Sequence, residues 1–399
     1  MLSEVQVLEL AKTLVSIRSD GSPEWETGIL HWLEEFFQDK PVKMVFIDTG
    51  LEDGRDNLLI LPRTIQGITR EKKAGFKGEG LLFCGHMDVV HPGDLDTWHS
   101  DPFKPWIGNG DDGKEILHGR GTSDMKGALA AFIVSFLSYI DAINEATKQD
   151  RVIGLLFTVD EEVGLRGADA FASSSHARLF DKAILGEPTR MIPVRGHKGV
   201  LFERIKVSGR AAHGSVPDQG ISAIKIAMDF YHHLEKAHEE GVTCHSHPLL
   251  GDPTLNLGVF RGGTAPNVVP DECTLEIDRR ITKGENVEDV RQGFRDMVDA
   301  MHLPDGAMIK EECINSRPPY YLDDDEPFLS FIESLLGPAT IMNGYTEAGC
   351  YFNDGGISTI ILGPGSIDQA HVANEHVAIA QLDKAVDVYS SLIRSYLGD

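Results

Sequence analysis

Histidine and acidic residues follow four short apolar runs of this sequence, at positions where their side chains could act together. They are His86 and Asp88, Glu161 and Glu162, Glu187, and His371. A seventh candidate, Asp124, lies in a glycine-bounded segment between the first two runs. Imidazole and carboxylate groups are the ligands that zinc takes in catalytic sites, where one coordination position stays open for water. These residue types therefore predict a metal site that carries out hydrolysis.

The number of candidate ligands suits two metal ions. Two ions about 3.5–4 Å apart can hold a water molecule against a scissile carbonyl, and metal binding lowers the pKa of that water from about 15.7 towards roughly 7. Glu161 and Glu162 are adjacent, and successive side chains in extended backbone point to opposite sides. One of them can therefore bind metal while the other stays free.

The four apolar runs have the character of buried parallel strands, because they are short and bounded by glycine or charged residues. They are Leu81–Phe83, Val152–Val159, Ala183–Leu185 and Thr359–Leu362. Met125–Ile140 is apolar nearly all round and predicts a buried crossover helix. Strand, helix and strand indicate an α/β fold with a central, mostly parallel sheet. Ligands bind beyond the carboxyl ends of such strands, so one crevice could collect the candidate residues.

Residues 193–316 have a different pattern, which predicts a small α+β domain of ferredoxin-like type inserted into the larger one. Strands are expected at Val200–Val207, at Leu255–Phe260 and where Cys273, Leu275 and Ile277 alternate. The expected helices carry apolar faces, with Ile221, Ile224, Met228 and Tyr231 on the first and Val287, Val290, Phe294, Val298 and Met301 on the second. The expected catalytic domain then comprises 1–192 and 317–399, and the insertion comprises 193–316.

Composition narrows the class of protein. A chain of 399 residues is long for one core and favours two domains. With 37 basic and 62 acidic residues the formal net charge is −25, which would repel nucleic acid and anionic membranes, so small molecules are the expected partners. The five cysteines show no CxxC spacing and fit reduced thiols rather than metal ligands. The N-terminal stretch has amphipathic helix spacing instead of a signal sequence, so the cytoplasm is the expected location.

Seven motifs occur in one order along the chain. They are Gly85-His-Met-Asp-Val-Val90, Asp101-Pro-Phe103, Gly119-Arg-Gly-Thr-Ser-Asp-Met-Lys-Gly127, Asp160-Glu-Glu162, Gly186-Glu-Pro-Thr189, Ala-Ala-His213-Gly-Ser and Gly363-Pro-Gly-Ser-Ile-Asp-Gln-Ala-His371. In this order the motifs resemble the peptidase M20 metallohydrolases, the family of acetylornithine deacetylase, succinyl-diaminopimelate desuccinylase, aminoacylase and carboxypeptidase G. The resemblance extends over essentially the whole chain.

The resemblance implies a role for each candidate near the metals. His86 and Glu187 would bind one zinc, Glu162 and His371 would bind the other, and Asp124 would bridge both. Glu161 would be the general base, which takes a proton from the bridging water and passes it to the leaving amine. Asp88 would hold the His86 ring, an orientation that a metal-bound imidazole also needs on physical grounds.

The resemblance also implies a homodimer formed through the inserted domain. His213 would stabilise the oxyanion from the neighbouring subunit, and Asn267 and Arg280 would hold the substrate carboxylate. A guanidinium suits that role because it pairs with a carboxylate through two hydrogen bonds. Gly363 and Gly365 would let the backbone approach the same group. A loop position, a turn and a salt bridge are the ordinary alternatives for His213, Asn267 and Arg280.

The substrate stays open at this stage. An N-acyl-amino-acid deacylase is the first interpretation, a dipeptidase or carboxypeptidase of the same family is the second, and a catalytically silent relative that binds a small molecule is the third. His197-Lys198-Gly199 stands where desuccinylases typically carry an arginine, which speaks against a diaminopimelate substrate, and Gly363–His371 resembles acetylornithine deacetylase more closely. Two Zn²⁺ per subunit are expected, with Co²⁺ or Mn²⁺ as alternatives because divalent ions compete by availability.

Overall fold

The computed structural model describes residues 4–21, 23–51, 54–65, 80–110, 113–148, 150–242 and 245–398. The chain divides into two compact units, which we call the large unit and the small unit. The large unit comprises Met1–Arg195, Leu322–Thr340 and Thr346–Asp399, and the small unit comprises Gly196–Tyr321 and Ile341–Tyr345. Against the expected insertion at 193–316, the small unit begins at 196, ends at 321 and adds the short segment 341–345.

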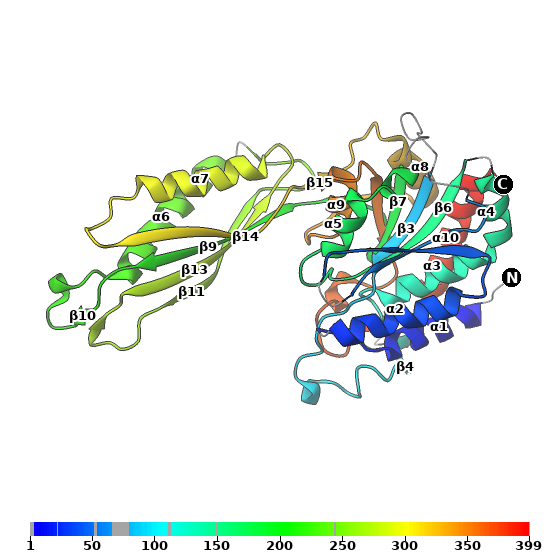
Figure 1. The fold of residues 1–399 in the computed structure, drawn as a ribbon, viewed down its shortest axis with the longest axis horizontal. Helices are drawn as coiled ribbons and strands as arrows, with labels where there is room; N and C mark the ends of the chain where they lie inside the picture. The colour runs from blue at the N-terminus through cyan, green and yellow to red at the C-terminus, as the bar shows by residue number, and fades with distance from the viewer. Residues whose placement is uncertain are drawn as a thin grey trace. The chain divides into compact units, whose positions relative to one another are not determined.

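A sheet of mixed direction forms the centre of the large unit (Figure 1). Its strands follow the order β1-β2-β6-β3-β7-β17-β8, and β16 also pairs with β8. Their bounds are β1 (Val42–Ile47), β2 (Asn57–Pro62), β3 (Gly80–His86), β6 (Val152–Thr158), β7 (Lys182–Pro188), β8 (Val194–His197), β16 (Thr340–Met342) and β17 (Ser358–Gly363). β8 continues into the small unit, where Gly196 and His197 pair with β15 (Tyr320–Tyr321).

The four strands predicted from the apolar runs are β3, β6, β7 and β17, and they lie side by side as parallel neighbours. The pairs at both edges of the sheet are antiparallel. Every residue of β3 and β6 is buried, which is why these runs lack the alternation of a half-exposed strand. The predicted α/β class with a mostly parallel central sheet is confirmed.

Helices cover both faces of this sheet. They are α1 (Glu4–Ser16), α2 (Pro23–Phe37), α3 (Lys126–Ser138), α4 (Ile140–Thr147), α5 (Arg166–Ser173), α8 (Pro327–Leu336), α9 (Ala348–Asn353) and α10 (Ile379–Leu397). α3 packs on β3, β6 and β7 and contacts α1 and α10, whereas α5 contacts α9 (Figure 1). The chain moves in opposite directions along the sheet from β3 to β6 and from β6 to β7. Right-handed crossovers therefore place α3 and α5 on opposite faces.

α3 is the predicted buried crossover helix. Its residues from Lys126 to Phe136 are all buried, in agreement with a sequence that is apolar nearly all round. Among the described helices, none is by itself both long and apolar enough to cross a membrane. α3 and α4 meet that test only as a pair bent by 68°.

The small unit has the strand, helix, strand, strand, helix order that the sequence predicted, and a fourth strand completes it. Its elements are β9 (Gly199–Ser208), α6 (Ala223–Val242), β11 (Thr254–Gly262), β13 (Glu272–Ile281), α7 (Val287–Ala300) and β14 (Met308–Arg317), with the short strands β10 (Ala212–His213) and β12 (Val268–Val269). The antiparallel order β11-β13-β9-β14 is that of a ferredoxin-like fold (Figure 1).

The inner face of α6 agrees with the predicted one except at Met228. Ile224 and Tyr231 are partly buried and pack against the core of the small unit, as predicted. Met228 is 59% exposed, and the fully buried residues of the helix are Ala223, Ala227 and Phe230. The centre of the buried stripe lies one position earlier than predicted, because small alanines let the helix approach the sheet while Phe230 fills the core. In β13 the predicted alternation is confirmed, since the odd-numbered residues from Cys273 to Ile281 are buried.

Candidate metal centre

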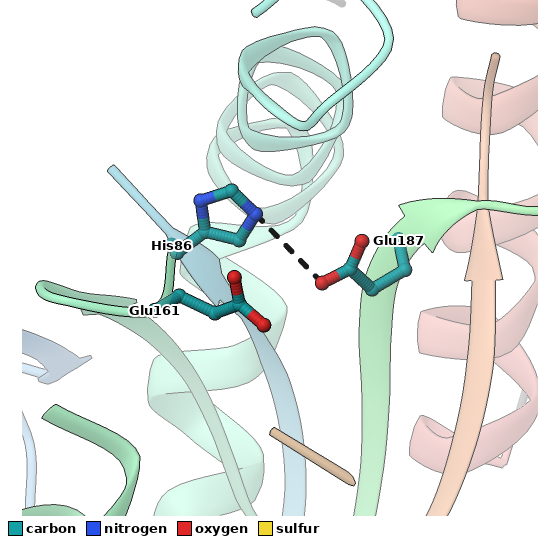
Figure 2. A group of neighbouring side chains, drawn as sticks. All are labelled: His86, Glu161 and Glu187. Atoms are coloured by element: carbon teal, nitrogen blue, oxygen red, sulfur yellow. Dashed lines mark ion pairs between the residues drawn. The ribbon is translucent and has the colours of Figure 1, made fainter. Parts of the chain in front are cut away.

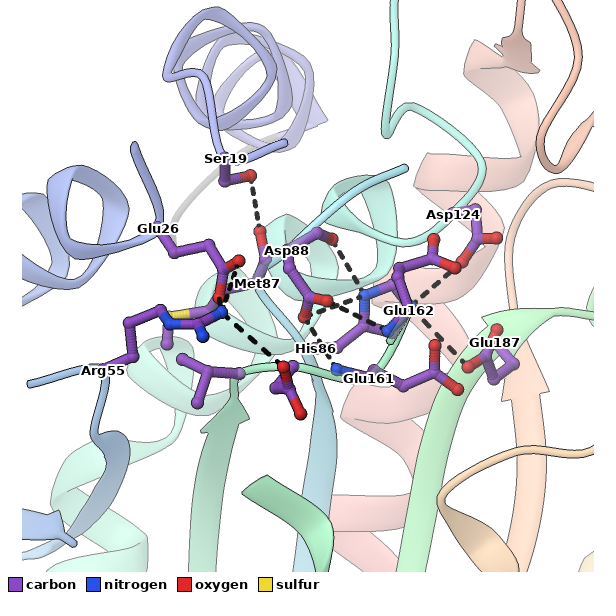
Figure 3. A network of polar contacts seen from close by, with 12 residues as sticks. Ser19, Glu26, Arg55, His86, Met87, Asp88, Asp124, Glu161, Glu162 and Glu187 are labelled. Atoms are coloured by element: carbon purple, nitrogen blue, oxygen red, sulfur yellow. Dashed lines mark hydrogen bonds and ion pairs between the residues drawn. The ribbon is translucent and has the colours of Figure 1, made fainter. Parts of the chain in front are cut away.

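The carboxyl ends of the parallel strands bring the candidate ligands together (Figure 3). His86 is the last residue of β3, and Glu187 is the last but one of β7. Glu161 and Glu162 lie in the turn after β6, and Asp124 lies two residues before α3. The sheet thus sets the positions of these side chains, as the crevice argument from the sequence requires.

His86 is fully buried and faces two carboxylates. Its Nε2 atom lies 3.1 Å from Asp124 Oδ1 and 3.7 Å from Glu187 Oε1. Ligand atoms of His86, Glu161 and Glu187 lie within 4.8 Å of one another, so Glu161 borders the same space (Figure 2). Ligands about 2.0–2.2 Å from one zinc are roughly 3.5 Å apart in tetrahedral geometry. The spacing around His86 therefore suits one metal ion.

Asp124 faces a second histidine with its other oxygen. His371 Nε2 lies 3.6 Å from Asp124 Oδ2 and 2.9 Å from Glu162 Oε2. A second close group of ligand atoms comprises His86, Asp124 and Glu162. The buried Asp124 carboxylate thus lies between two histidines, one at each oxygen, which is the arrangement that a bridging ligand needs.

The carboxylates of the site disfavour one another's charge. Although Glu161 keeps some exposed surface, desolvation raises the pKa of its carboxyl well above the ordinary value, and Glu187 and Glu162 raise it further. Burial also raises the pKa of Glu187 well above its usual range, with Asp124 as the next cause. Burial would lower the pKa of His86, but the Asp124 hydrogen bond and neighbouring acids raise it well above normal.

This donor set fits divalent cations. Two imidazoles and four carboxylates converge there. The carboxylates repel one another, and the positive charge of bound cations would offset that repulsion. Glu162 Oε1 is buried and has no hydrogen-bond partner among the described residues. A buried oxygen of that kind is costly unless it binds a donor or a cation.

Asp88 supports the site through two different groups. His86 Nδ1 donates to the backbone carbonyl of Asp88 at 2.9 Å, while the Asp88 carboxylate is 3.7 Å from that nitrogen. The carboxylate instead accepts the backbone N–H groups of Glu161 at 3.2 Å and Glu162 at 3.0 Å. Asp88 therefore holds the His86 ring through its carbonyl oxygen, and its side chain fixes the turn that carries the two glutamates (Figure 3).

A buried ion-pair network lies behind this turn and was not predicted from the sequence. Arg55 binds both oxygens of Glu26, at 2.9 and 3.0 Å (Figure 3). Arg55 also lies 3.7 Å from Asp160. Asp160 has a left-handed backbone, with φ of 62°, directly before Glu161. Arg55 and Glu26 come from segments without any motif, so only the tertiary fold reveals them.

Glu375 is a second residue that the sequence did not indicate. Its buried carboxylate accepts hydrogen bonds from Arg120 and from the backbone N–H groups of Gly121, Ser123 and Asp124. The glycine-bounded segment 119–127 superficially resembles a phosphate loop but lacks the Walker spacing. Its N–H groups do bind a carboxylate, and that carboxylate belongs to the protein's own Glu375. Burial raises the pKa of this carboxyl, Arg120 is the largest opposing cause, and the net pKa is about 7.

Glu347 is a third such residue, fully buried beside the site. Burial raises the pKa of its carboxyl, His86, Thr158 and Tyr351 oppose that rise, and the net pKa is about 7. Its charge contributes to the raised pKa of Glu161 and Glu187.

Gly363 and Gly365 lie where the ligand-bearing loops pack on one another. A side chain at Gly363 would meet the backbone oxygens of Gly186 and Glu187 at 2.0 and 2.5 Å. Gly365 has φ of 86°, and a side chain there would meet Ser123 Oγ at 2.3 Å. These close approaches explain both glycines by packing, independently of the substrate contact that the family resemblance implies.

His213 and Asn267 lie together in the small unit. β10 pairs with β12 so that His213 is opposite Val268, and Gly214 N–H donates to the Asn267 carbonyl at 2.7 Å. Both side chains are exposed. His213 Nδ1 accepts the Ser215 N–H at 3.2 Å and contacts the Ser215 hydroxyl at 2.7 Å. This pattern leaves the ring proton on Nε2.

Arg280 lies at the other end of the small sheet. It pairs in register with Val200, near the connections between the two units, whereas β10 lies beyond the opposite end of β13. Its guanidinium donates to Asp278 Oδ2 at 3.0 and 3.2 Å. The structure thus groups His213 with Asn267, and it gives Arg280 the salt bridge that was the ordinary alternative for this residue.

Comparison with known proteins gives one consistent result. Residues 82–395 match the family described as Peptidase family M20/M25/M40. The chain is 31% identical over 398 residues to an acetylornithine deacetylase from Vibrio atlanticus, with 98% of each chain covered. It is 36% identical over 318 residues to an acetylornithine deacetylase from Photorhabdus laumondii, with 79% of each covered.

A solved structure shows the same fold. A tripeptidase from Staphylococcus aureus superposes with a TM-score of 0.71 and 23% identity, over 100% of both chains. The family match covers well over half of the chain, and the relatives are named as deacetylases and peptidases. The chain therefore belongs to the peptidase family M20/M25/M40 and is a metal-dependent hydrolase of that family.

Proposed function

We propose that this enzyme uses two divalent metal ions to hydrolyse the amide bond of an N-acyl amino acid. The observation that carries the proposal is the placement of the Asp124 carboxylate, whose two oxygens face His86 and His371 separately. His86 and Glu187 would hold one ion, Glu162 and His371 the other, and Asp124 both. The ions would polarise the scissile carbonyl and lower the pKa of a shared water.

Glu161 is the proposed general base. The two adjacent glutamates diverge, since Glu162 reaches His371 at 2.9 Å while Glu161 borders His86 and Glu187. The Asp88 carboxylate holds the backbone of both, so each side chain keeps its own direction. Glu161 can then take a proton on its carboxylate oxygen and deliver it to the leaving amine nitrogen.

An N-acetyl amino acid of the acetylornithine type is the proposed substrate. Relatives from Vibrio that match nearly the whole length of the chain are named acetylornithine deacetylase. A dipeptidase or carboxypeptidase activity is the second candidate, because the solved structures with this fold include peptidases.

A release assay can separate these activities. N-acetyl, N-succinyl and N-formyl amino acids and dipeptides would be supplied to the enzyme with Zn²⁺, Co²⁺ or Mn²⁺. We expect N-acetyl amino acids to be hydrolysed fastest. Faster hydrolysis of dipeptides would establish the peptidase instead. Bound metal without turnover of any compound would indicate a relative that only binds small molecules.

His213 is proposed to stabilise the oxyanion. Because Ser215 occupies Nδ1, the imidazole offers an Nε2–H donor, which is the group that a developing negative charge on the carbonyl oxygen needs. The exposed position of His213 leaves this donor free to meet a substrate.

The position of His213 supports action on a neighbouring subunit. Within the small unit it lies at the end of the sheet away from the chain connections, whereas Arg280 lies at the connected end. The 10 residues of β13 separate the two ends, and at about 3.3 Å per residue they span roughly 30 Å. One small unit could not present both residues to one small substrate. We therefore propose that His213 and Asn267 come from one subunit and Arg280 from the other.

A homodimer is part of this proposal. β11 is an edge strand of the small sheet, and an unpaired edge is a natural place for contact with another chain. Exposed apolar side chains occur on β11, α6 and β12, namely Phe260 at 40%, Met228 at 59% and Val268 at 37%.

Substrate anchoring and location complete the proposal. Arg280 and Asn267 would bind the substrate carboxylate, which the backbone at Gly363 and Gly365 would approach.

The cytoplasm is the proposed location. The described cysteines support it, because Cys84, Cys273, Cys313 and Cys350 are all free thiols.

A further inference from the structure

Both oxygens of the Glu375 carboxylate are fully used by donors from one turn. Oε1 accepts the backbone N–H groups of Ser123 at 2.8 Å and Asp124 at 3.0 Å. Oε2 accepts the N–H of Gly121 at 2.9 Å and the guanidinium of Arg120 at 2.7 Å. Backbone N–H groups of one turn that converge on a carboxylate in this way form an anion-binding site. The geometry of the turn is therefore set by the carboxylate at its centre.

Further contacts join this turn to the segment that carries Glu375. Gly119 N–H donates to the Glu375 carbonyl at 3.0 Å, and Ser123 Oγ donates to the His376 carbonyl at 2.9 Å. β5 (Glu115–His118) ends directly before the turn, β18 (His376–Ala378) begins directly after Glu375, and the two strands pair with each other. Glu375 follows His371 by four residues. One short segment therefore carries one proposed metal ligand, His371, and also holds the turn that carries another, Asp124.

The hydrogen bonds of Glu375 fix the backbone of Asp124, the proposed shared ligand. Its backbone N–H is one of the four groups that Glu375 binds, and its side chain must direct one oxygen to His86 and the other to His371. A small rotation of the Asp124 backbone would move both oxygens at once. Any group that fixes this backbone therefore fixes the shared ligand of two ions.

We propose that Glu375 is a positioning residue of the metal centre, which holds the 121–124 turn so that the Asp124 carboxylate can bridge two metal ions. The inference rests on the two-metal function proposed above. It adds that the shared ligand and His371 are coupled through one buried glutamate, whose carboxylate is bound by four donors of the 120–124 turn.

Glu375→Gln is the variant that tests this role. The glutamine side chain is nearly the same size but loses the charge that faces Arg120. Its NH₂ group must also face backbone N–H donors that a carboxylate oxygen accepts. Changes to groups that orient metal ligands typically cost about 10–100-fold in metal affinity. We expect that loss for metal binding to the folded variant.

Glu285→Gln is the matched control. Glu285 lies in the small unit, and its carboxylate binds Arg279 and the N–H of Thr282 at 2.8 Å. Its side chain is 2% exposed, so the control also removes a charge from a buried arginine pair. It lies in a different unit from every proposed metal ligand, and we expect its metal affinity to equal that of the unsubstituted enzyme.

The measurement is a Co²⁺ titration of the chelator-treated full chain, followed by calorimetry and by the d–d absorption of the bound ion. Circular dichroism and the melting temperature of each metal-free variant report the fold separately. We expect weaker binding and an altered cobalt spectrum for Glu375→Gln alone. If that variant loses thermal stability yet binds two ions with unchanged affinity and spectrum, Glu375 is only structural and the inference is wrong.

Two further outcomes are distinguishable from that one. If the unsubstituted enzyme binds fewer than two ions, the proposed two-metal function itself is wrong. If Glu375→Gln does not fold, Glu375→Asp keeps the charge on a side chain one methylene shorter, which cannot reach all four donors. We expect intermediate metal affinity for the aspartate variant, and unchanged affinity there would likewise overturn the inference.

Discussion

The turns that carry the proposed metal ligands in the large unit and the proposed substrate-facing residues of the small unit are held in opposite ways. His86, Asp124 and Glu187 are buried, and the backbone around them is fixed by other buried groups such as Asp88 and Glu375. His371 is the exposed member of the proposed ligand set, with 57% of its side chain accessible. His213 and Asn267 are exposed and belong to a pair of two-residue strands with local hydrogen bonds. A metal centre needs ligands fixed before the ions bind, whereas a group that meets the substrate must stay open to solvent.

Because of this difference, we expect substitutions in the two units to lower activity for different reasons. Substitutions in the large-unit site should change metal content, or the proton transfer beside the metals. Substitutions in the small unit should leave metal content intact and lower turnover. The four predictions below test that separation, from the largest expected effect to the smallest.

Asp124→Ala should have the largest effect, because it removes the one carboxylate that both proposed ions share. We expect both ions to be lost and activity to be abolished. His86→Ala should mainly weaken one ion. Metal analysis by mass spectrometry checks both variants, with Asp169→Ala as an acidic control outside the site. Full occupancy in the Asp124 variant would rule out a bridging role.

Glu161→Gln should abolish proton transfer while leaving the metals in place. General acid–base help is typically worth about 10²–10⁴-fold, so kcat should fall by at least the lower of these factors. Glu162→Gln serves as the paired variant and should lose metal instead. The roles of the two glutamates are exchanged if Glu161→Gln loses metal and Glu162→Gln retains it.

His213→Ala should be nearly inactive with full metal content. An oxyanion donor is worth about 2.7–4 kcal/mol, which corresponds to roughly 10²–10³ in kcat. His302→Ala, an exposed histidine of the same unit, should retain normal activity. Analytical ultracentrifugation should show a homodimer for the unsubstituted enzyme and for both variants.

Mixing the two inactive variants tests whether His213 acts across the dimer. A mixed dimer of His213→Ala and Glu161→Gln contains one site with both an intact Glu161 and a partner's intact His213. Activity should therefore return under conditions of subunit exchange. If exchange is demonstrated and activity stays absent, His213 serves its own subunit or has no role in the reaction.

The sequence predicted the parallel strands of the large sheet. β3, β6, β7 and β17 are buried throughout or nearly so, and each follows from an apolar run bounded by glycine or charge. β2 is also buried at every residue but was not predicted. α6 was harder, because its inner face is built from Ala223 and Ala227 as well as Phe230. Alanines carry little hydrophobic signal, so the larger Met228 was placed inside when it is exposed.

The candidate ligands could be predicted from the sequence because most of them follow strands directly and all occur in recognisable motifs. The residues that support these ligands could not be predicted from the sequence. Glu375 and Glu347 lie far along the chain from the segments they contact, as do Arg55 and Glu26. A buried glutamate in a polar stretch looks like any surface glutamate until the fold shows which donors surround it.

Arg280→Met should have the smallest effect of the four, and it can be measured by a thermodynamic cycle. If the guanidinium binds the substrate α-carboxylate, the substitution should lower kcat/KM for the acid by the worth of a charged hydrogen bond, about 1.5–3 kcal/mol or roughly 10–150-fold. The amide of the same substrate lacks that charge, so the enzyme with Arg280 should hydrolyse it more slowly, and Arg280→Met should hardly change that rate. Asp278→Asn is the companion variant, because Asp278 binds this guanidinium at 3.0 Å. It should change kcat/KM less than Arg280→Met, since the arginine itself remains. If acid and amide lose activity equally in Arg280→Met, the residue is only the partner of Asp278, and the carboxylate is bound elsewhere.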